Sequence, residues 1–271
     1  MPESEARYRF VGADGRVLSG MPPADALSLG EGAFETVLVL SGRPAMARRH
    51  LLRLERSCAE LGICRTEEAR AIFAAGLDFA ASEPELRARL RTAVLGEEGG
   101  RAVGIITVRA ASEPPQSISL AVSDSLRSTT DHMATHKTTS YFGNVTARRR
   151  AQAAGSDDAL IVDTERNVAE TSSANIFAVL HGVLATPAEG CILRGTVRDW
   201  VIEGSGKSWP RVEERRIALT ELLSAEAAFV TNAVIGIVPV SRVGERMLPP
   251  ASGFEWFRLL QDAFRAAVSA E

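Results

Sequence analysis

The hydrophobic pattern of this chain changes repeatedly between the spacing typical of helices and the spacing typical of strands. Residues 50–63 place apolar side chains three or four positions apart, which is the pattern of an amphipathic helix. Short β-rich runs such as 33–40 and 158–163 lie between stretches of this kind. Because sheet and helix alternate in both halves, we expect an α+β (mixed α/β) protein with two domains.

The same reading predicts the individual elements. We predict helices over 50–63, 66–81, 84–95, 144–155, 193–203, 219–227 and 254–270. We predict strands over 33–40, 102–108, 118–122, 158–163, 175–180, 183–186 and 228–231, with two further short strands around a turn within 7–19. Residues 123–135 are polar and without hydrophobic period, so we expect an N-terminal α/β domain over 1–122, a linker over 123–135 and a second domain over 136–271.

Composition excludes several classes of function. The chain has 271 residues and a net charge of -3, without a basic tract that would suggest a nucleic-acid partner. Its three cysteines form no CxxC pair, so we expect neither a disulfide framework nor a metal site. The N-terminus lacks an apolar signal core, and no run of about eighteen apolar residues could span a membrane. We therefore expect a cytoplasmic protein.

Lysine is almost absent, and this makes each lysine informative. Of the 31 residues that are lysine or arginine, only Lys137 and Lys207 are lysine. Arginine stays protonated at any working pH, whereas a lysine that is buried or beside other charges can lose its proton and act as a base or nucleophile. Lys137 is therefore a candidate catalytic amine, although the count alone is equally compatible with a surface lysine.

Two other segments offer groups that could bind a charged ligand. Gly195 and Thr196 open a predicted helix, whose start presents unpaired N–H groups, the positive end of the helix dipole and a hydroxyl. An ordinary N-cap is the commoner explanation of such a threonine. Glu170 follows a strand-like run and precedes three hydroxyl residues, 171–173, that could hold a carboxylate or a ring oxygen. A surface glutamate at a strand end is the alternative.

The run 204–208 (GSGKS) is similar to the end of a phosphate-binding P-loop. That loop requires a glycine five residues before Gly206, and this position is Val201. The run also follows a predicted helix, whereas a P-loop joins a strand to a helix. We therefore exclude a nucleotide hydrolase.

Six segments together resemble the class IV aminotransferases, the fold-type IV enzymes that use pyridoxal 5'-phosphate (PLP). In chain order they are GEGAFETVLVLSGRP, HLLRL, K-x-x-x-Y-x-x-N-V-x-A, AETSSANIF, L-x-G-x-x-R and TNAVIGIVPV. The resemblance covers nearly the whole chain. It implies a two-domain fold-type IV architecture with the active site at the domain junction, a PLP cofactor, a small-molecule amino substrate and a homodimer.

The resemblance also implies roles for particular residues. Lys137 matches the lysine that forms a Schiff base with PLP and moves the proton. Glu170 matches the carboxylate that pairs with the pyridine nitrogen; a negative charge there keeps the nitrogen protonated, so that the ring can accept electrons. Arg53, from HLLRL, matches the arginine that binds the cofactor phosphate.

Further cofactor contacts are implied in the same way. Thr196 and Val197 match the helix start that binds the phosphate, and Leu193 matches the residue against the ring. Tyr141 is similar to a tyrosine that hydrogen-bonds the ring hydroxyl in branched-chain enzymes, although theirs lies one residue further from the lysine. Ala233 stands where those enzymes carry a phosphate-binding threonine, so only its N–H remains as a donor.

The departures from the family's patterns favour one kind of member. Arg109 is not followed by the histidine with which D-amino-acid enzymes hold a substrate carboxylate. Thr36, in Phe-Glu-Thr, and the Asn-Ala of TNAV are similar to 4-amino-4-deoxychorismate lyases. We therefore predict a PLP-dependent lyase that eliminates pyruvate and yields 4-aminobenzoate for folate biosynthesis, with Thr36 and Arg109 as candidate substrate contacts.

Two other functions remain open at this point. The chain could be an aminotransferase that acts on branched-chain or D-amino acids with 2-oxoglutarate. It could also be a non-catalytic homologue that binds a phosphorylated ligand.

Overall fold

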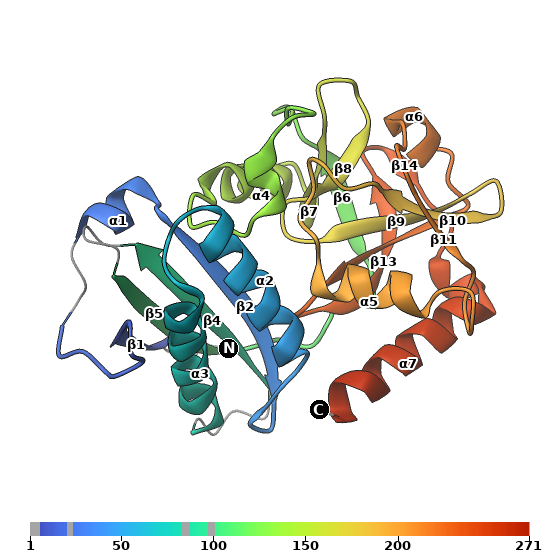
Figure 1. Ribbon diagram of the computed structural model, residues 1–271. Helices are drawn as coiled ribbons and strands as arrows, with labels where there is room; N and C mark the ends of the chain where they lie inside the picture. Colours follow the sequence, from blue (N-terminus) through green and yellow to red (C-terminus); the bar gives the residue numbers. More distant parts are fainter. Residues whose placement is uncertain (1–5, 21–23, 83–86, 97–100, 271) are drawn as a thin grey trace. The chain divides into compact units, whose positions relative to one another are not determined.

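The computed structural model describes residues 6–20, 24–82, 87–96 and 101–270. Spatial proximity divides the chain into two compact units. The first unit holds the described residues up to Ser112 together with His136–Tyr141 and residues 268–270. The second holds Glu113–Thr135 and Phe142–Ala267. The mixed α/β class predicted from the sequence is confirmed (Figure 1).

Apart from the predicted linker, these units differ from the predicted domains in three segments, one of which is the C-terminal residues 268–270 in the first unit. Strand β6 (Ile118–Val122) falls in the second unit because it pairs with β7 (Asp158–Val162) and β13 (Gly236–Val243). Residues 136–141 belong to the first unit because they hydrogen-bond to strand β2 (Gly32–Leu40). Neither pairing is visible in the local composition, which is what the predicted boundary at 123–135 was based on.

The first unit is an antiparallel sheet with helices packed on one face. Its elements are β1 (Arg7–Gly12), α1 (Ala24–Leu29), β2, β3 (Arg43–Pro44), α2 (Ala47–Glu60), α3 (Thr66–Ala81), β4 (Arg87–Gly96) and β5 (Ala102–Ala110). The strand order is β1-β5-β4-β2-β3. Helices α2 and α3 lie along this sheet (Figure 1) and bury an apolar core between helix and sheet, in which Leu54, Ile72 and Leu90 are almost fully buried.

The second unit is built on a larger mixed sheet. Its strands are β6, β7, β8 (Val168–Thr171), β9 (Asn175–Leu180), β10 (Val183–Pro187), β11 (Val212–Arg215), β12 (Ala227–Asn232), β13 and β14 (Arg246–Met247). Its helices are α4 (Phe142–Ala153), α5 (Thr196–Gly204), α6 (Leu219–Leu222) and α7 (Glu255–Ala270), with 3-10 turns at His132–Thr135 and Ala251–Gly253. The path runs β11-β10-β9-β12-β13-β6-β7-β8.

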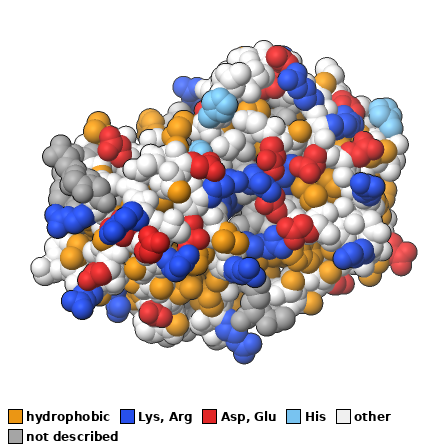
Figure 2. Space-filling view, viewed as in Figure 1, with side chains coloured by type: hydrophobic (Ala, Val, Ile, Leu, Met, Phe, Trp, Pro, Cys, Tyr) orange, Lys and Arg blue, Asp and Glu red, His pale blue; other side chains and the backbone are white. Residues whose placement is uncertain are grey.

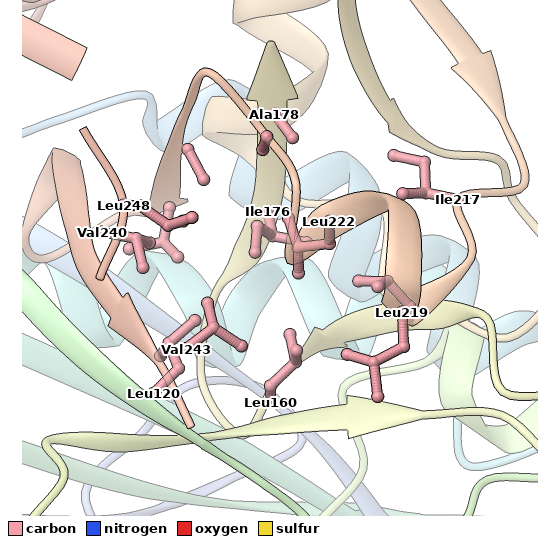
Figure 3. Packing of buried hydrophobic residues seen from close by; sticks show 14 of the residues in the cluster. Leu120, Leu160, Ile176, Ala178, Ile217, Leu219, Leu222, Val240, Val243 and Leu248 are labelled. Carbon is pink, nitrogen blue, oxygen red and sulfur yellow. The ribbon is translucent and has the colours of Figure 1, made fainter. Parts of the chain in front are cut away.

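This larger sheet curls around an apolar core. Its last strand, β8, also lies against β9 and β10, which are far from it along the path. Side chains from β6, β7, β9, β13 and α6 therefore converge on one cluster (Figure 3), which includes Leu120, Leu160, Ile176, Leu222 and Val240. On the other face of β9 and β12, Phe177 and Phe229 stack with centroids 4.9 Å apart, and Phe229 contacts Phe257 of α7.

The sequence predicted most of these elements, and some predictions were wrong. Helix α3 and strands β6 and β9 have the predicted bounds. The helix predicted over 219–227 is only α6, and Ala227 already opens strand β12. Of the two short strands predicted within 7–19 only β1 forms, with an isolated bridge at Val17. Residues 84–95 were predicted as a helix, but the described part, Arg87–Gly96, is strand β4. Its burial alternates: Ala88, Leu90 and Thr92 point into the core, whereas Arg87, Arg89 and Arg91 do not. This period of two is the strand signal, which the helix-favouring composition outweighed in the prediction.

Candidate functional site

Lys137 lies in a short extended segment that is attached to strand β2. The Phe34 N–H donates to the Lys137 carbonyl at 2.8 Å, and the Thr139 N–H donates to the Gly32 carbonyl at 2.8 Å. Thr139 also donates its hydroxyl to the carbonyl of Gly30 at 2.7 Å. The segment is thus bonded along β2, with an isolated β-bridge between Ala33 and Thr138, and the sheet fixes the backbone of the candidate amine.

Two aromatic rings surround the Lys137 side chain within this unit. Its Nζ lies 4.5 Å from the ring centroid of Phe34 and 5.0 Å from that of Tyr141. The two rings meet edge to face, with centroids 5.5 Å apart. The Arg91 guanidinium also lies over Phe34, at 4.7 Å from the centroid. Phe34 thus brings Arg91, a residue that the sequence analysis missed, into the neighbourhood of Lys137.

The predicted substrate contacts lie on the same sheet face as Phe34. In the strand register Arg91 of β4 is opposite Thr36 of β2 on one side and Thr107 of β5 on the other. Arg109 is two residues beyond Thr107, so it shares this face. Desolvation by the packed side chains around it and the positive charges of Arg89 and Arg109 lower the pKa of Arg91. Such a concentration of positive charge favours the binding of an anion.

Arg53 is held by a buried acid that the sequence analysis did not single out. Its Nε donates to Glu35 Oε1 and its NH2 to Glu35 Oε2, each at 2.7 Å. His50, one helical turn before Arg53 on α2, places Nδ1 2.6 Å from Glu35 Oε2. Glu35 and His50 are fully buried. The acid thus fixes the orientation of the guanidinium, and the predicted role of Arg53 as a phosphate ligand remains a prediction.

Neighbouring charges and burial determine the protonation states of Glu35 and His50. Burial alone would raise the pKa of Glu35, but Arg53 and His50 lower it from 4.5 to about 2. Burial lowers the pKa of His50 despite the attraction of Glu35. Glu35 is therefore ionised at neutral pH and His50 is neutral, so His50 Nδ1–H is the donor to the carboxylate. A histidine and an arginine three apart, and a glutamate inside an apolar strand, were the sequence signals for this network.

In the second unit, Glu170 is held by three donors. Arg127 donates NH1 to Glu170 Oε1 at 2.7 Å, while Asn175 Nδ2 and the Leu193 N–H both donate to Oε2 at 3.1 Å. Glu170 is 6% exposed. Arg127 comes from the segment that the sequence analysis predicted to be a linker, and nothing in the local sequence distinguishes it from the other arginines. The predicted residues Glu170 and Leu193 are thus in direct contact.

The start of α5 lies beside this acid. Gly195 packs closely against the Asn175 side chain. A Cβ added at Gly195 would overlap Asn175 Oδ1. Thr196 follows as the first residue of α5, so its N–H and that of Val197 have no acceptor within the helix. Asn175 is opposite Thr231 in the register of β9 and β12. The helix start and the acid are therefore joined through Asn175.

Ala233 lies in a turn that leaves its N–H available. Asn232 Oδ1 accepts from the N–H groups of Val234 and Ile235, each at 2.9 Å, and thereby shapes the turn. Among the described residues the Ala233 N–H has no such acceptor. The hydroxyl of Thr231, one strand residue before Asn232, is buried and has no hydrogen-bond partner in the described structure. Unpaired donors thus gather at this end of β12.

The three hydroxyls after Glu170, which could have held a carboxylate or a ring oxygen of a ligand, bind a carboxylate of the chain itself. Thr171 and Ser173 donate to Asp158 Oδ2 at 2.9 Å each, and Ser172 donates to Asp158 Oδ1. Asp158 is 5% exposed. The carboxylate that these hydroxyls hold is therefore the chain's own, and the cluster fixes the loop between Glu170 and Asn175.

The surface carries charges of both signs. On the face in Figure 2, basic side chains and acidic side chains are interspersed over both the left and the right of the view. Within the part of the chain that the structure describes, no helix combines the length and the apolar composition that crossing a membrane requires.

Comparison with known proteins identifies a family for this chain. A family model described as "Amino-transferase class IV" matches residues 32–243. A putative branched-chain-amino-acid aminotransferase of Methanocaldococcus jannaschii is 32% identical over 173 residues, which are 64% of this chain and 54% of that protein. The chain thus spans about half the length of this curated relative.

Solved structures align over more of the chain. The 4-amino-4-deoxychorismate lyase from Pseudomonas aeruginosa is 25% identical, with a TM-score of 0.82 and coverage of 97% of this chain and 98% of that one. The PLP-bound form of a hypothetical aminotransferase from Mycobacterium tuberculosis is 24% identical, with a TM-score of 0.80 and coverage of 97% and 99%. These matches show that both units belong to one known fold.

Proposed function

The chain belongs to the class IV aminotransferase family, whose members are PLP-dependent enzymes, and we propose that it is a 4-amino-4-deoxychorismate lyase. In this reaction the amino substrate loses pyruvate and becomes 4-aminobenzoate. The proposal assigns the residues of each unit a role, and these roles follow from the contacts within that unit.

The residues of the second unit fit a phosphorylated pyridine. The orphaned, buried hydroxyl of Thr231 is a group that a bound ligand would satisfy, since unpaired buried polar groups cost free energy. Thr196 and Val197 at the start of α5 and the Ala233 N–H add backbone donors of the kind that bind phosphate. Glu170 offers a buried carboxylate to a ring nitrogen.

The first unit supplies the amine and its surroundings. Lys137 would hold the cofactor's aldehyde through Nζ and would move a proton at the same atom. The rings of Phe34 and Tyr141 hold this amine in place. Arg53 presents to the phosphate the guanidinium that Glu35 orients. When bound, PLP supplies an electron-accepting ring, which stabilises the charge left when a substrate proton is removed.

Arg91 and Arg109 support a substrate with two carboxylates. 4-Amino-4-deoxychorismate has two carboxylates, whereas a branched-chain amino acid has one. Arg91 and Lys137 both contact the ring of Phe34. Thr107 of the neighbouring strand is opposite Arg91, and Arg109 lies two residues beyond Thr107. The guanidinium groups on this face, with Arg89 opposite Arg109 in the register, suit a dianionic substrate, because charge-assisted hydrogen bonds to carboxylates are strong and specific.

An aminotransferase is the second candidate, and the curated relatives favour it. The M. jannaschii protein is described as a putative branched-chain-amino-acid aminotransferase. The same arginines would also suit 2-oxoglutarate, which carries two carboxylates. The two functions therefore differ in the amino donor and in the fate of its amino group.

One assay distinguishes them. Purified protein is loaded with PLP and given 4-amino-4-deoxychorismate; we expect equal amounts of pyruvate and 4-aminobenzoate. In parallel, leucine, valine and D-alanine are offered with 2-oxoglutarate; we expect glutamate formation to be at least tenfold slower. Fast glutamate formation without release of 4-aminobenzoate would assign the aminotransferase function instead.

We propose further that the enzyme is a homodimer, as expected from the resemblance to its family. Sedimentation equilibrium of the purified chain measures this directly. A mass of twice the 29.0 kDa chain is the expected result, and a monomer at micromolar concentration would contradict it.

A further inference from the structure

Arg127 is a buried arginine whose side chain and backbone are both fixed by hydrogen bonds. Its NH1 donates to Glu170 Oε1 at 2.7 Å and to the Cys191 carbonyl at 2.8 Å. Its side chain is 9% exposed, and that of Glu170 is 8% exposed. The backbone is equally constrained, because the Arg127 N–H donates to the Val162 carbonyl and the Thr164 N–H donates to the Arg127 carbonyl. A guanidinium held in this way is a permanent charge next to Glu170.

The position of Glu170 does not depend on Arg127 alone. The second oxygen, Oε2, accepts from Asn175 Nδ2 and from the Leu193 N–H, each at 3.1 Å. Asn175 is itself anchored, since its Nδ2 also donates to the Leu193 carbonyl at 2.8 Å. Two neutral donors thus keep the carboxylate in place. What Arg127 adds to them is mainly a positive charge.

This charge affects any cation that approaches Glu170. Charges of opposite sign at hydrogen-bond distance interact strongly when they are screened from water. Burial would lower the pKa of Arg127, but the attraction of Glu170 raises it. A second cation at Glu170 is therefore attracted by the carboxylate and repelled by the guanidinium. A neutral ligand of the same shape experiences neither effect to the same extent.

We propose that Arg127 is a positioning residue that acts through Glu170: it shares the carboxylate's charge and so limits how tightly Glu170 holds a protonated ring nitrogen. The ligand class is a phosphorylated aromatic aldehyde with a basic ring nitrogen. The inference rests on the proposed function, because it takes Glu170 as the partner of the ring nitrogen of PLP. It adds a residue from segment 123–135, to which the sequence analysis gave no function.

The test compares two ligands that differ at one ring atom. PLP has a basic ring nitrogen, whereas in 1-deazapyridoxal phosphate a C–H group replaces it and cannot carry a proton. The quantity of interest is the ratio of dissociation constants, Kd for the deaza compound over Kd for PLP, measured by titration of the cofactor-free protein. In Arg127→Gln we expect this ratio to rise about tenfold above the wild-type value, which corresponds to about 1.4 kcal/mol.

Two further variants separate charge from structure. Arg127→Lys keeps the positive charge, so its ratio should stay near the wild-type value. Arg198→Gln removes another buried arginine, which donates to Glu214 at 2.7 Å and to the Pro187 carbonyl at 2.9 Å and is 1% exposed. It should lower the thermal stability as Arg127→Gln does, but leave the ratio unchanged, because its carboxylate partner is not Glu170.

The outcomes distinguish the inference from the function on which it rests. A ratio in Arg127→Gln that is unchanged or lower than in the wild type overturns the role of Arg127, while PLP binding itself stands. An equal rise in Arg127→Lys overturns the charge argument as well. If the wild-type chain binds neither compound, the proposed function fails, and the assignment of Arg127 fails with it.

Discussion

Replacing Glu35 by glutamine should remove a pH-dependent part of the protein's stability. The substitution keeps the size of the side chain but removes the charge that Arg53 and His50 face. All three groups lie in the interior of the first unit, with side-chain exposures of 0%, 9% and 0% for Glu35, Arg53 and His50. Removal of one partner from a buried ion pair typically costs about 3–5 kcal/mol, because the other charge stays buried.

The lowered pKa of Glu35 gives the pH dependence of this effect. The pKa is about 2 in the folded protein, against 4.5 for an unperturbed glutamate. A folded-state pKa below the unfolded value stabilises the fold above the unfolded value, and this contribution is lost as the pH falls towards the folded value. At about 1.4 kcal/mol per pKa unit the whole contribution is about 3 kcal/mol, and about 2 kcal/mol of it is lost between pH 7 and pH 3.

Guanidinium denaturation of the wild type and of Glu35→Gln at pH 7, 5, 4 and 3 measures this directly. The difference in unfolding free energy should be largest at pH 7 and shrink by about 2 kcal/mol at pH 3. Glu31→Gln, four residues earlier and exposed, is the matched control and should change stability by about 0.5 kcal/mol or less at every pH. A difference that is independent of pH between 7 and 3 would refute the argument that Glu35 is ionised and paired in the fold.

Other substitutions test the remaining parts of the site. Gly195→Ala should cost about 1–3 kcal/mol of stability in thermal unfolding and weaken PLP binding, because the new Cβ overlaps Asn175 Oδ1; unchanged PLP affinity would separate this glycine from the phosphate site. Asp158→Asn should cost about 2 kcal/mol, since three hydroxyls lose a charged acceptor; Asp157→Asn, which bonds Ser119 on the exposed side, should cost half of this or less, and equal losses would contradict the special role of Asp158. Arg91→Gln should raise KM for 4-amino-4-deoxychorismate about tenfold or more with little loss of PLP affinity; an unchanged KM would exclude Arg91 from substrate binding.

Local patterns in the sequence were sufficient for most of the fold. The three- and four-residue spacing of α3 and the short apolar run of β9 each define an element without knowledge of its partners. Strand β4 was mispredicted because Ala, Leu and Arg favour helices, and only the sheet around it makes the alternation decisive. The curling of the larger sheet depends on contacts between β8 and β9 that no local pattern encodes.

Site residues could be predicted where they belong to a recognisable motif. They could not be predicted where their importance depends on the residue that they contact in the fold. Lys137 stands out by residue type, and Glu170 by its place in AETSSANIF. Arg127 and Asp158 have no such signal, because their importance arises from the groups they contact: Glu170 in one case and three hydroxyls in the other. A single sequence with 31 basic residues cannot distinguish which arginine is buried against an acid.

The proposed function depends on Lys137 as the amine that binds PLP. Borohydride reduction of the PLP-loaded protein, followed by mass spectrometry of its peptides, tests this in a single measurement. We expect one phosphopyridoxyl group per chain, on Lys137, and none on Lys207. A protein that binds PLP but carries the label on Lys207 or at the N-terminus, or carries no label at all, would contradict it.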